Sequence, residues 1–207
     1  MDKKTRIAVF VSGGGTNLQA IIDAEKSGII KSGKTELVIS DNPEAYALER
    51  AKANGIKTAV VLKNNGQAEF EKKISEILAE NKIEMIILAG FMSILSADFT
   101  SKWPERIINI HPSLIPSFCG KGCYGLHVHE KALAYGVKVT GATVHFVNEI
   151  PDGGRIISQK AVYIEDGDTP ETLQRRVMEQ AEWILLPAAA EKVAGEIAEK
   201  GESYGHL

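Results

Sequence analysis

Three polar side chains stand at positions in this sequence that suit an acyl transfer without a side-chain nucleophile. Asn109 and His111 follow the apolar pair Ile107-Ile108, and Asp152 opens an Asp-Gly-Gly segment. An Asn can donate a hydrogen bond to a developing oxyanion, a His can pass a proton near neutral pH, and an Asp can orient and charge that His. If the apolar pair is part of a strand, its period of two places Asn109 and His111 on one face at the carboxyl end, where open α/β sheets bind ligands.

Each of these residues also has an ordinary structural interpretation. A single His after a strand is usually a hydrogen-bonded structural residue, and Asn and Asp-Gly-Gly are common in turns. The three together, in a chain that also carries a phosphate-type loop, favour the chemical interpretation. A carboxylate beside His111 would stabilise the imidazolium, so we expect Asp152 to hold the pKa of His111 above its ordinary value of about 6.5.

A glycine-rich loop follows the first apolar run, Ile7 to Val11. It reads Gly13-Gly14-Gly15-Thr16-Asn17 and precedes a segment with helical spacing. Backbone N–H groups in such a loop, together with the helix N-terminus, can bind a phosphate. Leu18 stands where the dinucleotide fingerprint requires its third Gly, and no Gly-Lys-Ser/Thr follows. The loop therefore predicts a single phosphate monoester rather than NAD or ATP; the alternative is a tight turn capped by Thr16 or Asn17.

Short apolar runs alternate with helical patterns through the first half of the chain. We expect strands over residues 7–11, 36–40, 58–61, 85–90 and 107–109, and helices over 16–22, 45–54, 69–81 and 96–103. This alternation predicts an α/β fold, a Rossmann-like, mostly parallel sheet with helices on both faces. After residue 110 the pattern predicts a helix over 129–135, two more strands over 140–148 and 156–164, and one long helix from Pro170 to about Lys200, interrupted or kinked at Pro187.

The size and composition fit one ordinary globular domain. The chain has 207 residues, 44% of them hydrophobic and 25% charged, with a net charge of -3. We expect a single domain over 1–207, with a phosphate-binding half (1–110) and a second half (111–207) that carries the active-site loop, the strand extension and the long helix. The absence of a basic excess argues against nucleic acid or an anionic membrane as a partner. Residues 1–6 show no secretory signal, which predicts a cytoplasmic protein.

The two cysteines, Cys119 and Cys123, lie in one Gly-rich loop. In a reducing location their thiols are expected to be free. Their spacing would also allow a disulfide or a shared metal, but no second Cys or His pair stands at zinc-finger spacing, so we expect no metal.

Two further features have less specific patterns. Phe91 to Leu95 is an apolar segment just past an expected strand end, which could line a pocket for a flat heterocycle or could be core. Glu179 and Glu182 lie three residues apart on the expected long helix, a spacing that is most often solvated surface.

Several motifs resemble those of the phosphoribosylglycinamide formyltransferase family. They are Ser12-Gly13-Gly14-Gly15-Thr16-Asn17-Leu18-Gln19-Ala20-Ile21-Ile22, Leu88-Ala89-Gly90-Phe91-Met92 with Ile94-Leu95, Asn109-Ile110-His111-Pro112-Ser113-Leu114, and Thr143-Val144-His145-Phe146-Val147 with Asp152-Gly153-Gly154. The resemblance runs in order from about residue 5 to 190. It implies formyl transfer from 10-formyltetrahydrofolate to the amine of glycinamide ribonucleotide, in de novo purine synthesis, by a protein that is a monomer or homodimer and binds only small molecules.

The resemblance also implies a role for each matching residue. Gly14, Gly15, Thr16 and Asn17 would hold the ribonucleotide phosphate, and Glu182 would contact the ribose. Met92, Ser93, Ile94 and Leu95 would line the folate pocket through their backbone, with Gln67 and Asn109 also at the co-substrate. Asn109 would stabilise the oxyanion, His111 would donate the proton, and Asp152 would raise the pKa of His111.

Two departures from the family pattern and two alternatives accompany this interpretation. The family often has Arg near position 67 and at position 93, so Gln67 and Ser93 are expected to weaken the grip on the folate glutamate tail. The loop from Ser117 to Tyr124 is longer than the simplest family pattern. A formyltetrahydrofolate hydrolase is one alternative, which would predict an additional N-terminal regulatory domain. A nucleotide-binding module without catalysis is the other.

Overall fold

Five parallel strands build the first part of a seven-stranded sheet. The computed structural model describes residues 4–201. Residues 1–3, part of the stretch in which we saw no secretory signal, lie outside this range. The strands are β1 (Thr5–Val11), β2 (Gly33–Ser40), β3 (Lys57–Val60), β4 (Met85–Leu88), β5 (Ile107–His111), β6 (Val139–Phe146) and β7 (Ile156–Tyr163), in the spatial order β3-β2-β1-β4-β5-β6-β7. Pairing is parallel from β3 to β5 and antiparallel from β5 to β7. The predicted mostly parallel α/β fold is confirmed.

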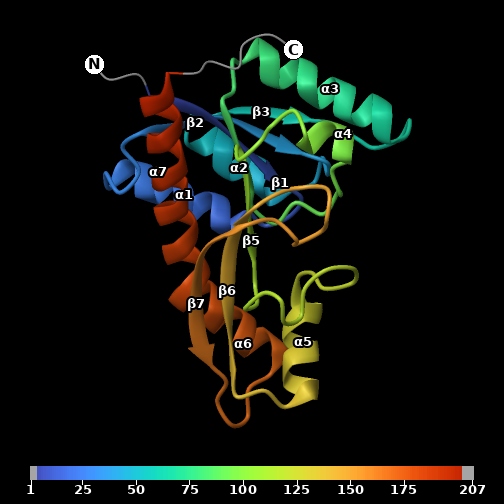
Figure 1. Ribbon diagram of the computed structural model, residues 1–207, viewed down its shortest axis with the longest axis vertical. Coiled ribbons are helices and arrows are strands. Elements are labelled where there is room, and N and C mark those ends of the chain that lie inside the picture. Colours follow the sequence, from blue (N-terminus) through green and yellow to red (C-terminus); the bar gives the residue numbers. More distant parts are fainter. Residues whose placement is uncertain (1–3, 202–207) are drawn as a thin grey trace.

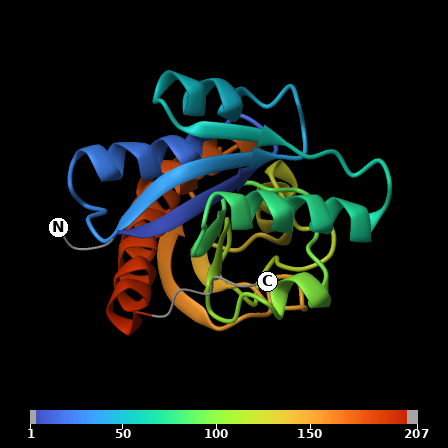
Figure 2. The same cartoon turned by 90° about the horizontal axis from the view of Figure 1, so that it is seen from above.

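Helices cover both faces of the parallel strands, as Figures 1 and 2 show. The helices are α1 (Thr16–Lys26), α2 (Tyr46–Ala53), α3 (Gln67–Glu80), α4 (Ala97–Thr100), α5 (Leu126–Tyr135), α6 (Pro170–Val177) and α7 (Trp183–Lys200). Side chains from α1, α2 and α7 share one apolar core with Val9 of β1, whereas α3 and α4 share another with Phe10. Neighbouring residues of one strand thus enter opposite cores, which explains the almost uninterrupted apolar runs.

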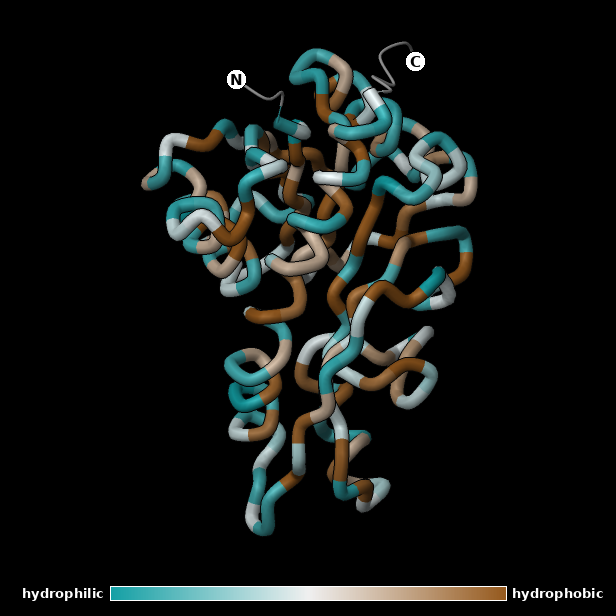
Figure 3. Tube along the Cα trace, turned by 60° about the vertical axis from the view of Figure 1, so that its left-hand side comes forward, coloured by the Kyte–Doolittle hydropathy of each residue, from teal (hydrophilic) through white to brown (hydrophobic). Residues whose placement is uncertain are grey.

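The antiparallel strands extend the sheet beyond the parallel part. In Figure 1, β6 and β7 lie below the parallel part, beside α5 and α6, and Figure 3 shows apolar residues concentrated inside the upper part of the molecule with polar residues on its outer loops. The carboxyl ends of β1, β4 and β5 therefore lie between the parallel part and this extension. Backbone hydrogen bonds tie these ends together, because the N–H of Ser12 donates to the carbonyl of Gly90 (3.0 Å).

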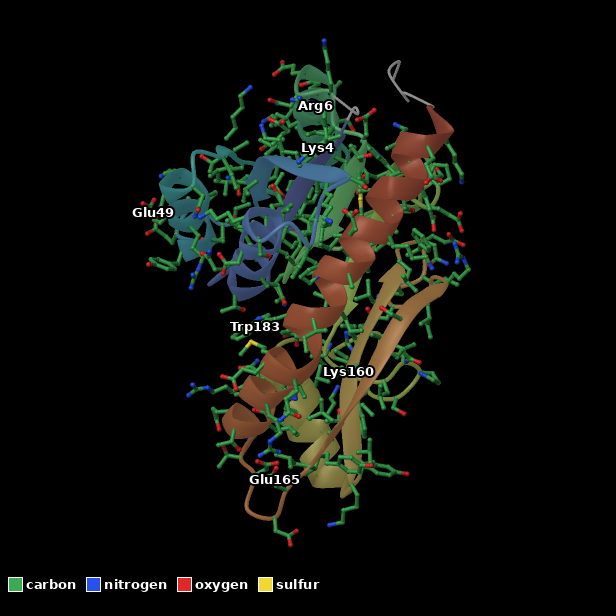
Figure 4. The ribbon with its side chains drawn as sticks, turned by 90° about the vertical axis from the view of Figure 1, so that its left-hand side faces the viewer. Lys4, Arg6, Glu49, Lys160, Glu165 and Trp183 are labelled. Atoms are coloured by element: carbon green, nitrogen blue, oxygen red, sulfur yellow. The ribbon has the colours of Figure 1, made fainter. Side chains whose placement is uncertain are left out.

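The long C-terminal helix is interrupted at a different place from the one predicted. A π-helical turn, Met178–Glu182, separates α6 from α7, and Pro187 lies inside α7. The predicted interruption at Pro187 was therefore wrong in position. A proline removes the hydrogen bond to the carbonyl four residues earlier and its ring crowds that carbonyl, so its effect falls on the turn before it, where α7 begins at Trp183 directly after the π segment. Figure 4 shows Trp183 at the start of α7, with Lys160 on β7 beside this helix.

Within residues 4–201, no helix combines the length and the apolar character that crossing a membrane requires.

Candidate active site

Strand β5 presents Asn109 and His111 on one face, as their spacing predicted. In the register of the sheet, Asn109 lies opposite His145 of β6 and His111 lies opposite Thr143. Because side chains alternate along a strand, this register brings the four polar side chains to one face of the β5–β6 pair. His111 is 4% exposed and His145 only 1%. The face is therefore a buried polar surface that opens toward the carboxyl end of β5.

His145 is a member of the site to which the sequence interpretation gave no role. Its Nδ1 lies 2.8 Å from the carbonyl oxygen of Phe146, and its Nε2 lies 3.1 Å from Nδ2 of Asn109. The carbonyl can only accept, so Nδ1 carries the hydrogen, and Nε2 accepts from the Asn109 amide. This bond uses one of the two amide hydrogens of Asn109 and fixes the direction of the other.

The Asp-Gly-Gly turn brings Asp152 onto the same surface. Oδ2 of Asp152 lies 3.7 Å from Nδ1 of His111, and Oδ1 lies 3.6 Å from Nε2 of His145. Asp152 has a φ of 56°, a conformation that Asp tolerates better than most residues. A Cβ on Gly154 would meet the Phe146 carbonyl oxygen at 1.7 Å. The glycine is needed because the backbone crosses β6 here, and this crossing is what positions the carboxylate.

Burial determines the direction in which the pKa of His111 shifts. Burial lowers the pKa of His111 below its ordinary value of 6.5, and the charge of Asp152 raises it by less. The expectation that His111 titrates above 6.5 was therefore wrong, although the sign of the Asp152 contribution was correct. Nε2 of His111 lies 2.9 Å from the carbonyl oxygen of Phe118, so this nitrogen carries the hydrogen. The neutral ring thus faces Asp152 with the unprotonated Nδ1.

The extended loop after β5 contacts both of these side chains. Phe118 accepts the bond from His111, and the N–H of Gly120 donates to Oδ2 of Asp152 (2.8 Å). Cys119 lies between these two residues, and neither it nor Cys123 is in a disulfide. Burial raises the pKa of the Cys119 thiol, and the nearby negative charge of Asp152 raises it further. Cys119 is therefore a thiol, not a thiolate, at neutral pH.

A pocket adjoins this polar surface. It is lined by the segment from Phe91 to Leu95 on one side, by Val147 to Asp152 on another, and by Asn109 and His145. Met92 and Ile94 are 53% and 66% exposed, whereas Leu95 is buried. The predicted segment therefore does line a pocket. Gln67 does not line it; its side-chain amide donates to the carbonyl of Ile94 (3.0 Å) from behind the segment.

The glycine loop presents unused backbone donors. Within the part of the chain that the structure describes, no protein acceptor takes a hydrogen bond from the N–H groups of residues 13–17. Gly15 has a φ of 73°, and a Cβ there would meet the Cβ of Ala47 at 2.6 Å. Arg50 bonds the carbonyl of Gly14 (2.8 Å) and supports the loop from outside. The arrangement is suited to an anion.

Glu182 lies against this loop. Its carboxylate accepts a hydrogen bond from Nδ2 of Asn17 (2.6 Å), and the side chain is only 6% exposed. Burial raises the pKa of Glu182 to about 7. Glu179, by contrast, is exposed and pairs with Arg175. The spacing alone favoured a solvated pair, and the structure buries one member of it.

Comparison with known proteins gives the family. The model of the formyl transferase family matches residues 5–189. The chain is 43% identical over 184 residues to the phosphoribosylglycinamide formyltransferase of Haemophilus influenzae, covering 88% of this chain and 84% of that protein. It is 44% identical over 203 residues to the human trifunctional purine biosynthetic protein adenosine-3, covering 97% of this chain but 19% of that protein.

A solved structure agrees in fold and sequence. Glycinamide ribonucleotide transformylase 1 from Symbiobacterium toebii superposes with a TM-score of 0.86 at 39% identity, over 93% of this chain and 89% of that one. The chain spans about a fifth of the length of the trifunctional relatives. Since the family match covers most of the chain, this protein belongs to the formyl transferase family.

Proposed function

We propose that this protein transfers the formyl group of 10-formyltetrahydrofolate to the amine of glycinamide ribonucleotide, a step of purine biosynthesis. The observation that carries the proposal is the arrangement of Asn109 and Asp152 in the lining of one pocket, with His111 against Asp152 and a loop with free backbone donors nearby. The names of the relatives that match over most of the chain agree with this activity.

The ribonucleotide is assigned to the glycine loop. The free N–H groups of Gly14, Gly15, Thr16 and Asn17 would bind the phosphate, because they point to no protein acceptor. Glu182, held by Asn17, would accept a hydrogen bond from a ribose hydroxyl. The loop is joined to the other pocket through Ser12, whose hydroxyl accepts from the N–H of Met92 (2.8 Å).

The formyl donor is assigned to the pocket beside β5. Met92, Ser93, Ile94 and Leu95 would present backbone groups to the flat pterin ring, with the formyl group near Asn109. Gln67 would act at this site from behind Ile94. The hydroxyl of Ser93 donates to Asp41 (2.6 Å), so it is already occupied and offers no charge to a glutamate tail.

The reaction follows from the protonation states of these groups. The amine nitrogen attacks the formyl carbon, and the free amide hydrogen of Asn109 stabilises the oxyanion. His111 is neutral near pH 7 because its pKa is lowered, so its Nδ1 first accepts the proton that the amine loses. The imidazolium then returns this proton to N10 as the bond between N10 and the formyl carbon breaks. Asp152 stabilises the charged ring while it holds the proton.

Direct transfer is favoured over a covalent intermediate. Cys119, the thiol nearest to Asp152, has a raised pKa and donates its S–H to the carbonyl of Pro116 (3.3 Å). A thiolate is the nucleophile in cysteine chemistry, so this residue is poorly prepared for attack. Among residues 4–201, no three His, Cys, Asp or Glu side chains are grouped so as to hold a metal ion.

One assay separates the three functional hypotheses. The purified protein is incubated with 10-formyltetrahydrofolate in the presence and absence of glycinamide ribonucleotide, and both tetrahydrofolate and formylglycinamide ribonucleotide are measured. Formyl transfer that depends on the ribonucleotide supports the proposal. Release of formate at the same rate without the ribonucleotide would instead indicate a hydrolase. Binding of either compound without turnover would indicate a non-catalytic module.

The proposal includes only small-molecule partners and a cytoplasmic location, with a monomer or homodimer as the working state. Sedimentation velocity at several protein concentrations distinguishes these two states.

A further inference from the structure

The segment Met92–Leu95 is held in place from behind by side chains of other elements. It belongs to neither a helix nor a strand, so its shape depends on these contacts. They are the bonds from the Met92 N–H to Ser12, from the Ser93 hydroxyl to Asp41, and from Gln67 to the Ile94 carbonyl. The Gln67 amide also donates a hydrogen bond to a second residue of α3, Glu71.

Glu71 of α3 lies behind Gln67 and is only 8% exposed. Its carboxylate accepts a hydrogen bond from the Gln67 amide, from the N–H of Ser96 (2.6 Å) and from the Ser96 hydroxyl (2.6 Å). Within residues 4–201 no Lys or Arg forms an ion pair with it. Burying a carboxylate without a cation is costly unless donors satisfy it. Its three neutral donors belong to Gln67 and Ser96, which lie next to the end of the segment Met92–Leu95.

The Glu71 bonds determine where one free backbone donor points. Because a trans peptide is planar, fixing the Ile94 carbonyl toward Gln67 directs the N–H of Leu95 to the opposite side. No acceptor among residues 4–201 takes a hydrogen bond from this N–H, and Leu95 lines the pocket. The bonds to Ser96 fix the next peptide, where Ser96 caps α4 through the N–H of Phe99 (3.2 Å).

We propose that Glu71 is a positioning residue for the formyl donor. It orients the Gln67 amide and Ser96, which together preset the backbone of Ile94 and Leu95 in the pocket. Glu71 itself does not line the pocket, so it acts through these neighbours. The inference rests on the proposed function for the identity of the ligand, and it adds a residue on another helix to the determinants of its affinity.

The test compares Glu71→Gln with the wild-type enzyme. A glutamine has one accepting oxygen where the carboxylate has two, and its NH2 group cannot accept from the Ser96 hydroxyl, so the hydrogen bonds that hold Ser96 and the Ile94 carbonyl are weakened. We expect KM for 10-formyltetrahydrofolate to rise about tenfold, the effect of losing one hydrogen bond to a charged group. The kcat and the KM for the ribonucleotide should change less than about twofold, since no group at the reacting atoms is altered. Amide hydrogen exchange at Ser96 should become faster, because the hydrogen bond from its N–H to residue 71 is weakened.

Two further variants make the test decisive. Glu76→Gln removes a charge from an exposed position of the same helix and should leave both KM values unchanged. Gln67→Ala breaks the link to Ile94 while Glu71 stays, so it should reproduce the rise in KM for the formyl donor even if Glu71→Gln fails to fold. Equal KM values for the formyl donor in wild type and Gln67→Ala, or a fall in kcat alone, would overturn the proposal.

A binding measurement separates this inference from the proposed reaction. Calorimetry with 5-formyltetrahydrofolate reports on the folate pocket without any ribonucleotide. Weaker binding by Gln67→Ala supports the positioning role even if the wild type transfers no formyl group, in which case the proposed function alone fails. A wild type that binds no folate would overturn both.

Discussion

The substitution Glu182→Gln tests whether a buried, proton-binding carboxyl lies at the glycine loop. Glu182 is 6% exposed and has one hydrogen-bond partner, Asn17. Burial raises its pKa from 4.5 to about 7. Glutamine has nearly the same shape as protonated glutamic acid, and its carbonyl can still accept from Asn17. The variant therefore removes the titration and keeps the packing.

The magnitude follows from proton linkage. The folded protein binds a proton at Glu182 more tightly than the unfolded chain does, so this stabilisation is complete below pH 4.5 and is lost as the pH rises through about 7. At about 1.36 kcal/mol for each pH unit between these values, the loss is about 3 kcal/mol by pH 8.5. In a domain of this size the corresponding change in Tm is about 6–12 °C.

The measurement is urea unfolding of both proteins at pH 5 and pH 8.5. Between these pH values, the free energy of unfolding of Glu182→Gln should rise by about 2–3 kcal/mol relative to wild type. Other titrating groups, such as the buried His129, cancel in this double difference. Glu179→Gln, at an exposed position three residues earlier, is the control and should follow the wild-type profile. Parallel pH profiles for Glu182→Gln and wild type would refute the reasoning.

Three further predictions concern the proposed reaction. Asp152→Asn should lower the pKa of His111 further, because the carboxylate opposes the effect of burial, and should lower kcat; NMR titration of His111 that finds the same pKa in both proteins would reduce Asp152 to a turn residue. Gly15→Val should raise KM for the ribonucleotide far more than for the folate, because its Cβ would displace Ala47, whereas Gly28→Val, with a similar φ at the far end of α1, should change neither KM in steady-state assays. Asn109→Ala should lower kcat by about 10²–10³-fold; a well-folded variant with wild-type turnover would contradict its role at the oxyanion.

The local parts of the site could be predicted from the sequence. Asn109 and His111 share a face because a strand has a period of two. The glycine loop after β1 consists of consecutive residues, so a short motif is enough to identify it. The apolar runs likewise indicated the parallel strands, since a strand covered on both faces has few polar positions. These features depend on neighbours in the chain.

The parts that were missed depend on contacts between distant segments. His145 meets Asn109 only through the antiparallel register of β5 and β6, which no short pattern specifies. The pKa of His111 depends on how deeply the fold buries it, and burial outweighs the charge of Asp152. Glu179 and Glu182 look alike in sequence, yet only the packing of their helix against Asn17 distinguishes them.

The π-helical turn has a consequence for the phase of the C-terminal helix. Buried positions in α6 recur every fourth residue as Leu173, Val177 and then Ala181, whereas α7 continues the buried stripe from Glu182 to Leu186 and Ala190. The two stripes are out of step by one residue, and the wide turn absorbs the difference. Removing one residue from Met178–Glu182 would bring the two stripes into step, and it would change the direction in which the Glu182 side chain points relative to Asn17. The position of the Glu182 carboxyl at the glycine loop thus depends on the π-helical turn.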